Sequence, residues 1–162
     1  MKKKKQSAGL MMFRTYGGKI EILLAHPGGP FFSKKDNGHW TIPKGEPDEN
    51  EDLLLAAKRE FKEETGINPI TEFPDAVYIE LGSITQKGGK EVSGWAFEGS
   101  LVDGYVHSCN TVTIEWPPRS GKFKDFPEVD KVEFFNIEEA KKKIKEAQVP
   151  LIEKLEEKLK KN

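Results

Sequence analysis

The chain has 162 residues, of which 36% are hydrophobic, so it is long enough for one compact domain with a substantial core. Its 26 Lys and Arg residues nearly balance its 27 Asp and Glu residues. The resulting net charge of −1 argues against a general affinity for nucleic acid or an anionic membrane. The single cysteine, Cys109, excludes an internal disulfide and a cysteine-based zinc cluster, and we expect it to be a buried, inert thiol.

The N-terminus begins with Met1 followed by four lysines. We predict that residues 1–6 are a flexible, Lys-rich tail ahead of a single domain over 7–162. The apolar run at 10–13 is too short for a signal peptide, and no segment approaches the roughly 18 apolar residues of a membrane span. We therefore expect a cytoplasmic protein without a membrane partner, either a monomer or a homodimer.

The first part of the chain reads as strands and one long loop. Two apolar runs at 7–13 and 19–26, joined by a segment that contains Gly17 and Gly18, predict a β-hairpin. A loop rich in glycine, proline and lysine follows over 27–38, and loops of this length are usually functional or mobile. A short strand is expected over 39–42.

A helix is predicted to end at Gly66, since glycine can take the left-handed conformation that stops a helix. Asp48 or Asn50 is the expected N-terminal cap. One face of this helix should pack in the core, and the opposite face should meet water. The core face is expected to carry Leu54, Ala57 and Phe61, and the solvent face Lys58 and Lys62.

The second half of the chain reads as strands followed by helices. Runs at 76–86 and 91–101 flank a glycine turn and predict an antiparallel pair. A strand over 111–116 should end at two prolines and lead into a basic loop. The remaining expected elements are a short strand over 132–135, a helix over 137–147 and a helix over 151–161 whose apolar stripe (Leu151, Ile152, Leu155 and Leu159) should pack in the core.

Three carboxylates crowd one face of the first helix. At the helical period, Glu60, Glu63 and Glu64 point within about 100° of one another. Like charges at this spacing repel, and a divalent cation is the natural compensator. Carboxylate oxygens suit Mg²⁺ or Mn²⁺ better than zinc, and the chain's three histidines show no ligand spacing among themselves.

The stretch from Gly45 to Ile67 reads G-x5-E-x7-R-E-F-x-E-E-x-G-I. It resembles the signature of the Nudix hydrolases at every fixed position. The resemblance implies an α/β (α+β) fold, an α/β/α sandwich with a central mixed sheet. It also implies a hydrolase that uses Mg²⁺, with Mn²⁺ as a possible substitute, to cleave a phosphoanhydride bond in a nucleoside diphosphate linked to another group.

The resemblance also implies roles for the signature residues. Glu60, Glu63 and Glu64 resemble the family's metal ligands and base, with the Gly45 carbonyl as a further ligand. The base is either Glu60 or a residue outside the signature. The remaining signature residues are Arg59, which would orient the catalytic glutamates through an ion pair with Glu51, and the structural residues Glu51 and Gly66.

Residues outside the signature complete the expected site. A metal or base carboxylate from another loop is common in the family, and Glu115 and Glu128 are candidates, with a plain surface glutamate as the alternative for each. The cations expected to meet phosphates are Lys44, Lys34, Lys35 and Arg119. Trp40 is a candidate for stacking on a base, although tryptophan at a strand end is as often a core residue.

The segment from His26 to Gly45 resembles a bacterial Nudix group of NTP or diadenosine polyphosphate pyrophosphohydrolases. We therefore expect a small-molecule nucleotide substrate, a dinucleoside polyphosphate or an NTP. One alternative is a MutT-like enzyme that removes oxidised nucleotides. Another is a non-catalytic module that binds a nucleotide, which is disfavoured because such a module could lose carboxylates that this chain retains.

Overall fold

A mixed β-sheet forms the centre of the molecule. The structure is a computed structural model that describes residues 5–161. Its six-stranded sheet has the order β4-β5-β1-β2-β8, with β3 also paired to β1, and only the β1–β5 pair is parallel. The strands are β1 (Gln6–Tyr16), β2 (Lys19–Pro27), β3 (Lys44–Gly45), β4 (Ile79–Thr85), β5 (Glu91–Glu98) and β8 (Val129–Asn136).

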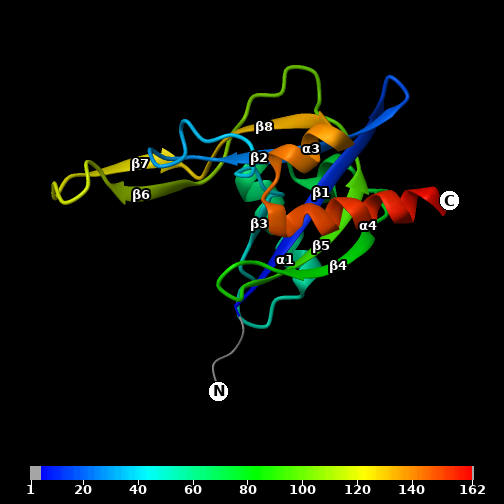
Figure 1. Cartoon of the computed structure of the whole chain (residues 1–162), viewed down its shortest axis with the longest axis horizontal. Helices are drawn as coiled ribbons and strands as arrows, with labels where there is room; N and C mark the ends of the chain where they lie inside the picture. Colours follow the sequence, from blue (N-terminus) through cyan, green and yellow to red (C-terminus); the bar gives the residue numbers. More distant parts are fainter. Residues whose placement is uncertain (1–4, 162) are drawn as a thin grey trace.

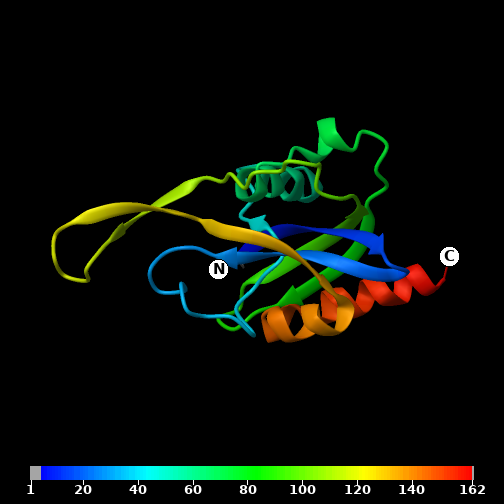
Figure 2. The same ribbon diagram turned by 90° about the horizontal axis from the view of Figure 1, so that it is seen from above.

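Helices cover both faces of this sheet (Figures 1 and 2). On one face lie α1 (Leu53–Thr65) and α2 (Pro69–Glu72). On the other lie α3 (Ile137–Lys143), the 3-10 helix η1 (Glu146–Gln148) and α4 (Val149–Lys160). The expected α/β/α sandwich with a central mixed sheet is confirmed.

Strand β1 supplies side chains to two hydrophobic cores. Met11 and Phe13 belong to the core beneath α3 and α4, whereas Leu10 and Met12 belong to the core beneath α1. Successive side chains of a strand point to opposite faces, so a strand covered on both sides becomes a continuous apolar run. The stripe of α4 is confirmed as core, because Leu151, Ile152 and Leu155 are buried and Leu159 is half-buried against them.

The first hairpin is confirmed, and the predicted strand over 39–42 is wrong. Trp40 and Thr41 make only isolated bridges, to Ile144 and Ala25. The backbone N–H of Ile42 donates to the Gln148 side chain, and Pro43 has no N–H to offer a neighbouring strand. Regular pairing therefore resumes only at β3.

A second correction concerns the segment after the two prolines, predicted to be a basic loop. Part of it forms β7 (Phe123–Pro127), which pairs with β6 (Thr111–Glu115) in a separate two-stranded antiparallel sheet. This β6–β7 arm, residues 111–127, projects from the body of the molecule (Figures 1 and 2). The following strand, β8, begins at Val129 rather than at 132, and the helix predicted over 137–147 ends at Lys143.

Helix α1 begins later than the sequence indicated. Its cap is Asp52, whose Oδ2 accepts hydrogen bonds from the N–H groups of Leu54 (3.1 Å) and Leu55 (3.2 Å). Asn50, one of the two predicted caps, has a φ of 62° and lies outside the helix. The predicted end is confirmed, because Gly66 has a φ of 79° in the left-handed region.

The apolar face of α1 also differs from the prediction by one residue. Ala56, Ala57 and Phe61 are buried, but Leu54 is only half-buried and lies outside both cores. Lys58 is half-buried with its Nζ 4.2 Å from the centre of the Tyr78 ring, so it does not simply meet water. Lys62 is exposed as predicted.

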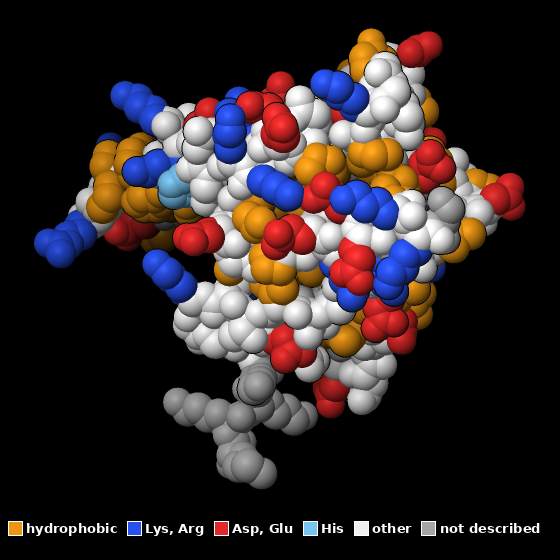
Figure 3. All heavy atoms as spheres, turned by 45° about the vertical axis from the view of Figure 1, so that its right-hand side comes forward, with side chains coloured by type: hydrophobic (Ala, Val, Ile, Leu, Met, Phe, Trp, Pro, Cys, Tyr) orange, Lys and Arg blue, Asp and Glu red, His pale blue; other side chains and the backbone are white. Residues whose placement is uncertain are grey.

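The predicted tail over 1–6 lies largely outside the described residues. Within them, the Lys5 carbonyl accepts a hydrogen bond from the Glu91 N–H and Gln6 begins β1, so ordered structure starts before the predicted residue 7. Across residues 5–161, no helix is long and apolar enough to cross a membrane. Figure 3 shows acidic and basic side chains interspersed over one face, in keeping with the near-neutral net charge.

Replacing Phe61 by Ala should destabilise the protein far more than replacing Leu54 by Ala. Phe61 is fully buried with its ring centre 5.5 Å from that of Phe97, so its truncation should cost about 3–5 kcal/mol of unfolding free energy. Leu54→Ala should cost well under about 2 kcal/mol because part of that side chain already meets water. Urea unfolding of both variants measures the difference, and equal costs would contradict the assigned core face.

Candidate active site

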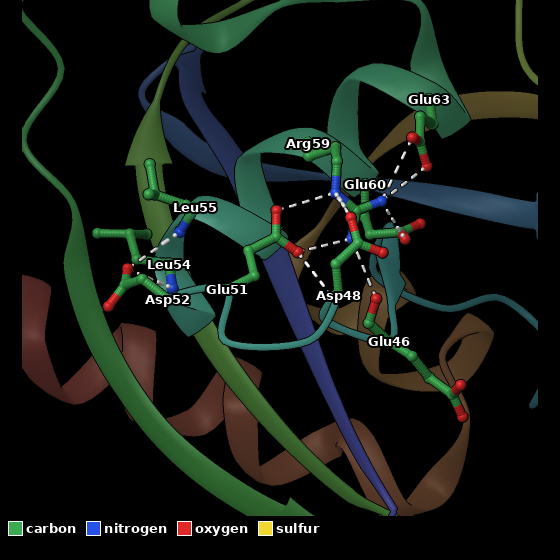
Figure 4. A network of polar contacts seen from close by, with 9 residues as sticks. All are labelled: Glu46, Asp48, Glu51, Asp52, Leu54, Leu55, Arg59, Glu60 and Glu63. Atoms are coloured by element: carbon green, nitrogen blue, oxygen red, sulfur yellow. Dashed lines mark hydrogen bonds and ion pairs between the residues drawn. The ribbon is translucent and has the colours of Figure 1, made fainter.

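Arg59 on α1 lies at the centre of the carboxylates that the signature predicted (Figure 4). Its Nε and one terminal nitrogen donate to the two Glu51 oxygens, at 3.0 and 2.9 Å. The other terminal nitrogen donates to Glu60 (2.9 Å) and Glu63 (3.2 Å), while the Glu46 carbonyl also accepts a bond. One guanidinium therefore orients three glutamates.

The Arg59–Glu51 ion pair is present as predicted, and its geometry is bidentate. The Arg59 bonds, followed by a bond from the Asp48 N–H, lower the pKa of Glu51 to about 2. The same contacts raise the pKa of Arg59 above its ordinary value. Both groups thus stay charged, and the planar fork fixes how the loop over 46–51 sits against α1.

Glu60 lies directly against the backbone of β3. A Cβ built on Gly45 would overlap the Glu60 carboxylate, so only glycine leaves room for it there. Burial is the largest cause of the raised pKa of Glu60, outweighing the hydrogen bond from Arg59, and the neighbouring Glu63 and Glu128 add to it. The glycine at the start of the signature is therefore explained by close approach rather than by backbone conformation.

Glu64 is buried and is bound by the backbone of β3 rather than by Arg59. It is 9% exposed, and its Oε1 accepts a hydrogen bond from the Lys44 N–H at 3.3 Å. Burial, followed by the charge of Glu128, raises the pKa of Glu64 to about 8. The three helix carboxylates thus share a neighbourhood but have different environments.

Glu128 is brought to this neighbourhood by the start of β8. Its N–H donates to the Asn110 carbonyl (2.9 Å), and the Asn110 N–H donates to the Glu63 carbonyl (2.9 Å). Burial and then Glu63 raise the pKa of Glu128. Asn110 was missed by the sequence reasoning because it acts through its backbone, which leaves no signal in residue type.

Glu115, the other predicted extra carboxylate, does not lie there. It pairs with Phe123 near the far end of the arm, and its Oε1 accepts a hydrogen bond from the Arg119 N–H at 2.7 Å. That bond closes the turn at the tip of the arm, where Arg119 has a φ of 61°. Glu115 therefore has a structural contact in place of the predicted role as base or metal ligand.

The prediction that Trp40 stacks on a base is wrong. It is 2% exposed, and its ring makes edge contacts with His26 and Phe135 at centroid distances of 5.0 and 4.9 Å. Its Nε1–H donates to Asp36 Oδ1 at 2.8 Å. A ligand cannot reach its faces, so the core alternative holds.

The predicted phosphate-binding cations lie in three different places. Lys34 and Lys35 line a recess beside α3 that none of the signature carboxylates lines, and Arg119 lies at the tip of the arm. Lys44 is on β3 next to Gly45, and burial followed by Lys145 and Lys90 lowers its pKa to about 8. Only Lys44 lies close to the carboxylates.

Cys109 is half-buried rather than buried as predicted. Its thiol donates a hydrogen bond to the Val129 carbonyl, with the sulfur 3.2 Å from the oxygen. Near it, His107 Nε2 bonds the same carbonyl at 2.6 Å, and its Nδ1 lies 3.1 Å from the Tyr105 hydroxyl. The Tyr105 hydroxyl in turn donates to the carbonyl of Thr65 at the end of α1. These bonds join the last turn of α1 to the residue after Glu128.

The donor set suits a hard divalent cation. Within residues 5–161, no three His, Cys, Asp or Glu side chains are gathered closely enough to hold a metal as they stand, since Arg59 occupies Glu60 and Glu63. All nearby donors are nonetheless oxygens, and the raised pKa values of Glu60, Glu64 and Glu128 indicate negative charge that a cation would stabilise. The residues present therefore fit Mg²⁺ or Mn²⁺.

Comparisons with known proteins show which family shares this sequence. A family model described as the NUDIX domain matches residues 3–155. The chain is 33% identical over 126 residues to the RNA pyrophosphohydrolase of Bartonella henselae, which covers 73% of this chain and 70% of that protein. It is 45% identical over 62 residues to the asymmetrical bis(5′-nucleosyl)-tetraphosphatase of Caenorhabditis elegans. That match covers 38% of this chain and spans only 41% of the relative.

Solved structures of Nudix proteins have a similar fold. The crystal structure of a C. elegans Ap4A hydrolase binary complex has a TM-score of 0.69 at 25% identity, covering 96% of this chain and 99% of that one. The NUDIX domain of Shewanella oneidensis NrtR, complexed with ADP ribose, has a TM-score of 0.66 at 16% identity, covering 98% and 90%, and shows the fold alone. The chain therefore belongs to the Nudix hydrolase family. Its class is that of hydrolases acting on pyrophosphate bonds.

In the metal-free protein, stability should fall as the pH rises from about 5.5 to 7. The raised pKa of Glu64 means that the folded state holds a proton that the unfolded state releases near the ordinary value of 4.5. The raised pKa values of Glu60 and Glu128 act in the same direction, and Lys44 titrates above this range. Thermal unfolding in EDTA should show a shallower pH slope for Glu64→Gln, and an unchanged slope would contradict the burial of this charge.

Proposed function

We propose that the protein is a Mg²⁺-dependent hydrolase that cleaves a phosphoanhydride bond in a nucleoside diphosphate linked to another group. One observation supports this best: the Glu60 carboxylate lies against Gly45, in a group of carboxyls with the buried Glu64 and with Glu128 that disfavour one another's ionisation. A diphosphate would add more negative charge. The site is therefore suited to bind its substrate together with a cation.

Glu60, Glu63, Glu64 and the Gly45 carbonyl would hold the cation, with Glu128 as a further ligand or as the base. When bound, Mg²⁺ neutralises phosphate oxygens and lowers the pKa of a coordinated water, and Mn²⁺ would substitute. Arg59 keeps Glu60 and Glu63 oriented through its bonds to both. Lys44 is the proposed phosphate contact nearest the site.

A dinucleoside polyphosphate is the proposed substrate. Support comes from the C. elegans tetraphosphatase, which shares 45% identity over 62 residues, and from the Ap4A hydrolase structure with its TM-score of 0.69. The similarity to an RNA pyrophosphohydrolase makes a 5′-triphosphorylated RNA the second candidate. NTPs and oxidised nucleotides are the remaining candidate substrates.

A nucleotide panel tests the proposal. With Mg²⁺, diadenosine tetraphosphate should be turned over with a higher kcat/KM than NTPs, 8-oxo-dGTP or 5′-triphosphorylated RNA, and EDTA should stop the reaction. Glu64→Gln should lower turnover by more than about 10- to 100-fold, the loss typical when only an outer partner of a metal site is removed. It should remain folded because glutamine resembles the protonated carboxyl. No turnover of any member with Mg²⁺ or Mn²⁺ would overturn the proposal.

Gly45→Ala should separate activity from stability. The added methyl would overlap the Glu60 carboxylate, which is the flexible end of its side chain and can move aside at little cost in stability. The displaced carboxylate would then no longer lie at the cation position. We expect kcat/KM to fall by at least about tenfold with a Tm within a few degrees of wild type. Gly94→Ala on β5, where the methyl meets the Leu151 side chain at 3.3 Å, is the matched control and should keep full activity.

A further inference from the structure

Among residues 5–161, the ring and side-chain contacts that support the β6–β7 arm from the body lie on one of its faces. A two-stranded hairpin is marginally stable alone, so it needs packing from elsewhere. The loop over 28–38 supplies it: Ile114 Cδ1 lies close to Gly29, and the rings of Trp116 and Phe31 meet edge to face at 5.4 Å. Ile114 and Trp116 therefore mark the covered face of the arm.

The opposite face of the arm is open. Side chains alternate along a strand, and residues directly opposite in an antiparallel pair share a face. Thr113 and Glu115, with their cross-strand partners Asp125 and Phe123, thus lie on the open face. Phe123 is 63% exposed, and the Thr113 hydroxyl donates to Asp125 Oδ1 at 2.6 Å. The open face carries an aromatic ring and a polar pair.

This open face begins at the proposed active site. The arm starts from the Thr111–Pro127 pair, flanked by Asn110 and Glu128. The Glu128 N–H donates to the Asn110 carbonyl, and the Asn110 N–H donates to the Glu63 carbonyl. The loop over 28–38 lies on the side of the arm away from α1 (Figure 2), so the open face is on the α1 side. At about 3.3 Å per residue, Phe123 lies roughly 13 Å along the strand from Pro127, with the Thr113–Asp125 pair between.

The charges of the arm are divided between its two faces. Lys124 lies opposite Ile114 and Lys122 opposite Trp116, so both lysines belong to the covered face. The two acidic residues of the arm, Glu115 and Asp125, belong to the open face. The open face therefore offers hydrogen-bond acceptors and an aromatic ring, which suit the uncharged sugar and base of a nucleotide. In Figure 3, hydrophobic side chains gather at the left, with basic and acidic side chains beside them.

We propose that the open face of the arm is a nucleoside subsite. The Phe123 ring stacks on the base, and the Thr113–Asp125 pair lies beside the sugar. The order of groups away from Glu128, polar pair and then aromatic ring, matches the order phosphate, sugar and base in a nucleotide. This assignment rests on the proposed function for the position of the reacting phosphates. Aromatic stacking accepts any base, and a carboxylate accepts hydrogen bonds from sugar hydroxyls.

Equilibrium binding of non-hydrolysable ligands tests the subsite without requiring turnover. The first ligand is a methylene-bridged analogue of diadenosine tetraphosphate, and the second is methylenediphosphonate, which has no nucleoside. Both are titrated with Mg²⁺ into wild type, Phe123→Ala and Tyr16→Ala. Tyr16 is the matched control because it is an aromatic residue, 66% exposed, at the turn of a different hairpin.

Phe123→Ala should raise the Kd of the nucleotide analogue about tenfold and change that of methylenediphosphonate by less than about twofold. Tyr16→Ala should change neither. Asp125→Asn should narrow the difference in Kd between the ribose and 2′,3′-dideoxyribose forms of the analogue.

The subsite is overturned if Phe123→Ala leaves the nucleotide Kd unchanged, or weakens both ligands equally. It is also overturned if wild type binds the nucleotide analogue no more tightly than methylenediphosphonate. Absence of turnover in the nucleotide panel would instead overturn the proposed reaction, and the ratio of the two Kd values would still decide the subsite.

Discussion

A single guanidinium organises the carboxylates of this protein. Arg59 binds Glu51 through both of its oxygens and reaches Glu60 and Glu63 from its remaining terminal nitrogen. Removing Arg59 would leave three carboxylates facing one another, and the loop before α1 would lose its attachment to the helix. The positions of the helix, the loop and the glutamates therefore depend on one another through this residue.

The protein also keeps a carboxyl group where it is costly to ionise. Glu64 is 9% exposed, and both burial and Glu128 disfavour its charged form. Such a group is poorly explained by folding alone, because a neutral side chain of the same shape would fit without the penalty. A cation bound by Glu64, Glu60 and Glu128 would remove that penalty. Cation binding therefore explains a buried carboxyl at this position better than folding does.

The extent to which the sequence predicts this structure differs from feature to feature. Local rules were sufficient for the first hairpin and the glycine that ends α1, since each depends on neighbours in the chain. The Arg59–Glu51 pair was predicted from the resemblance to the Nudix signature. They failed where distant segments decide. Trp40 is buried by β2, β8 and α3, and β7 exists because β6 is available to pair with it. The position of Asn110 depends on backbone bonds that no residue type reveals.

The closure at the base of the arm has a consequence for how such proteins diversify. Because the Glu128 N–H binds the Asn110 carbonyl, the chain leaves the body and returns to it at adjacent points. The segment between them can change in length or composition without moving the carboxylates of α1. The proposed nucleoside subsite and the proposed cation ligands would thus lie on separable parts of the chain, so that substitutions in one need not disturb the other.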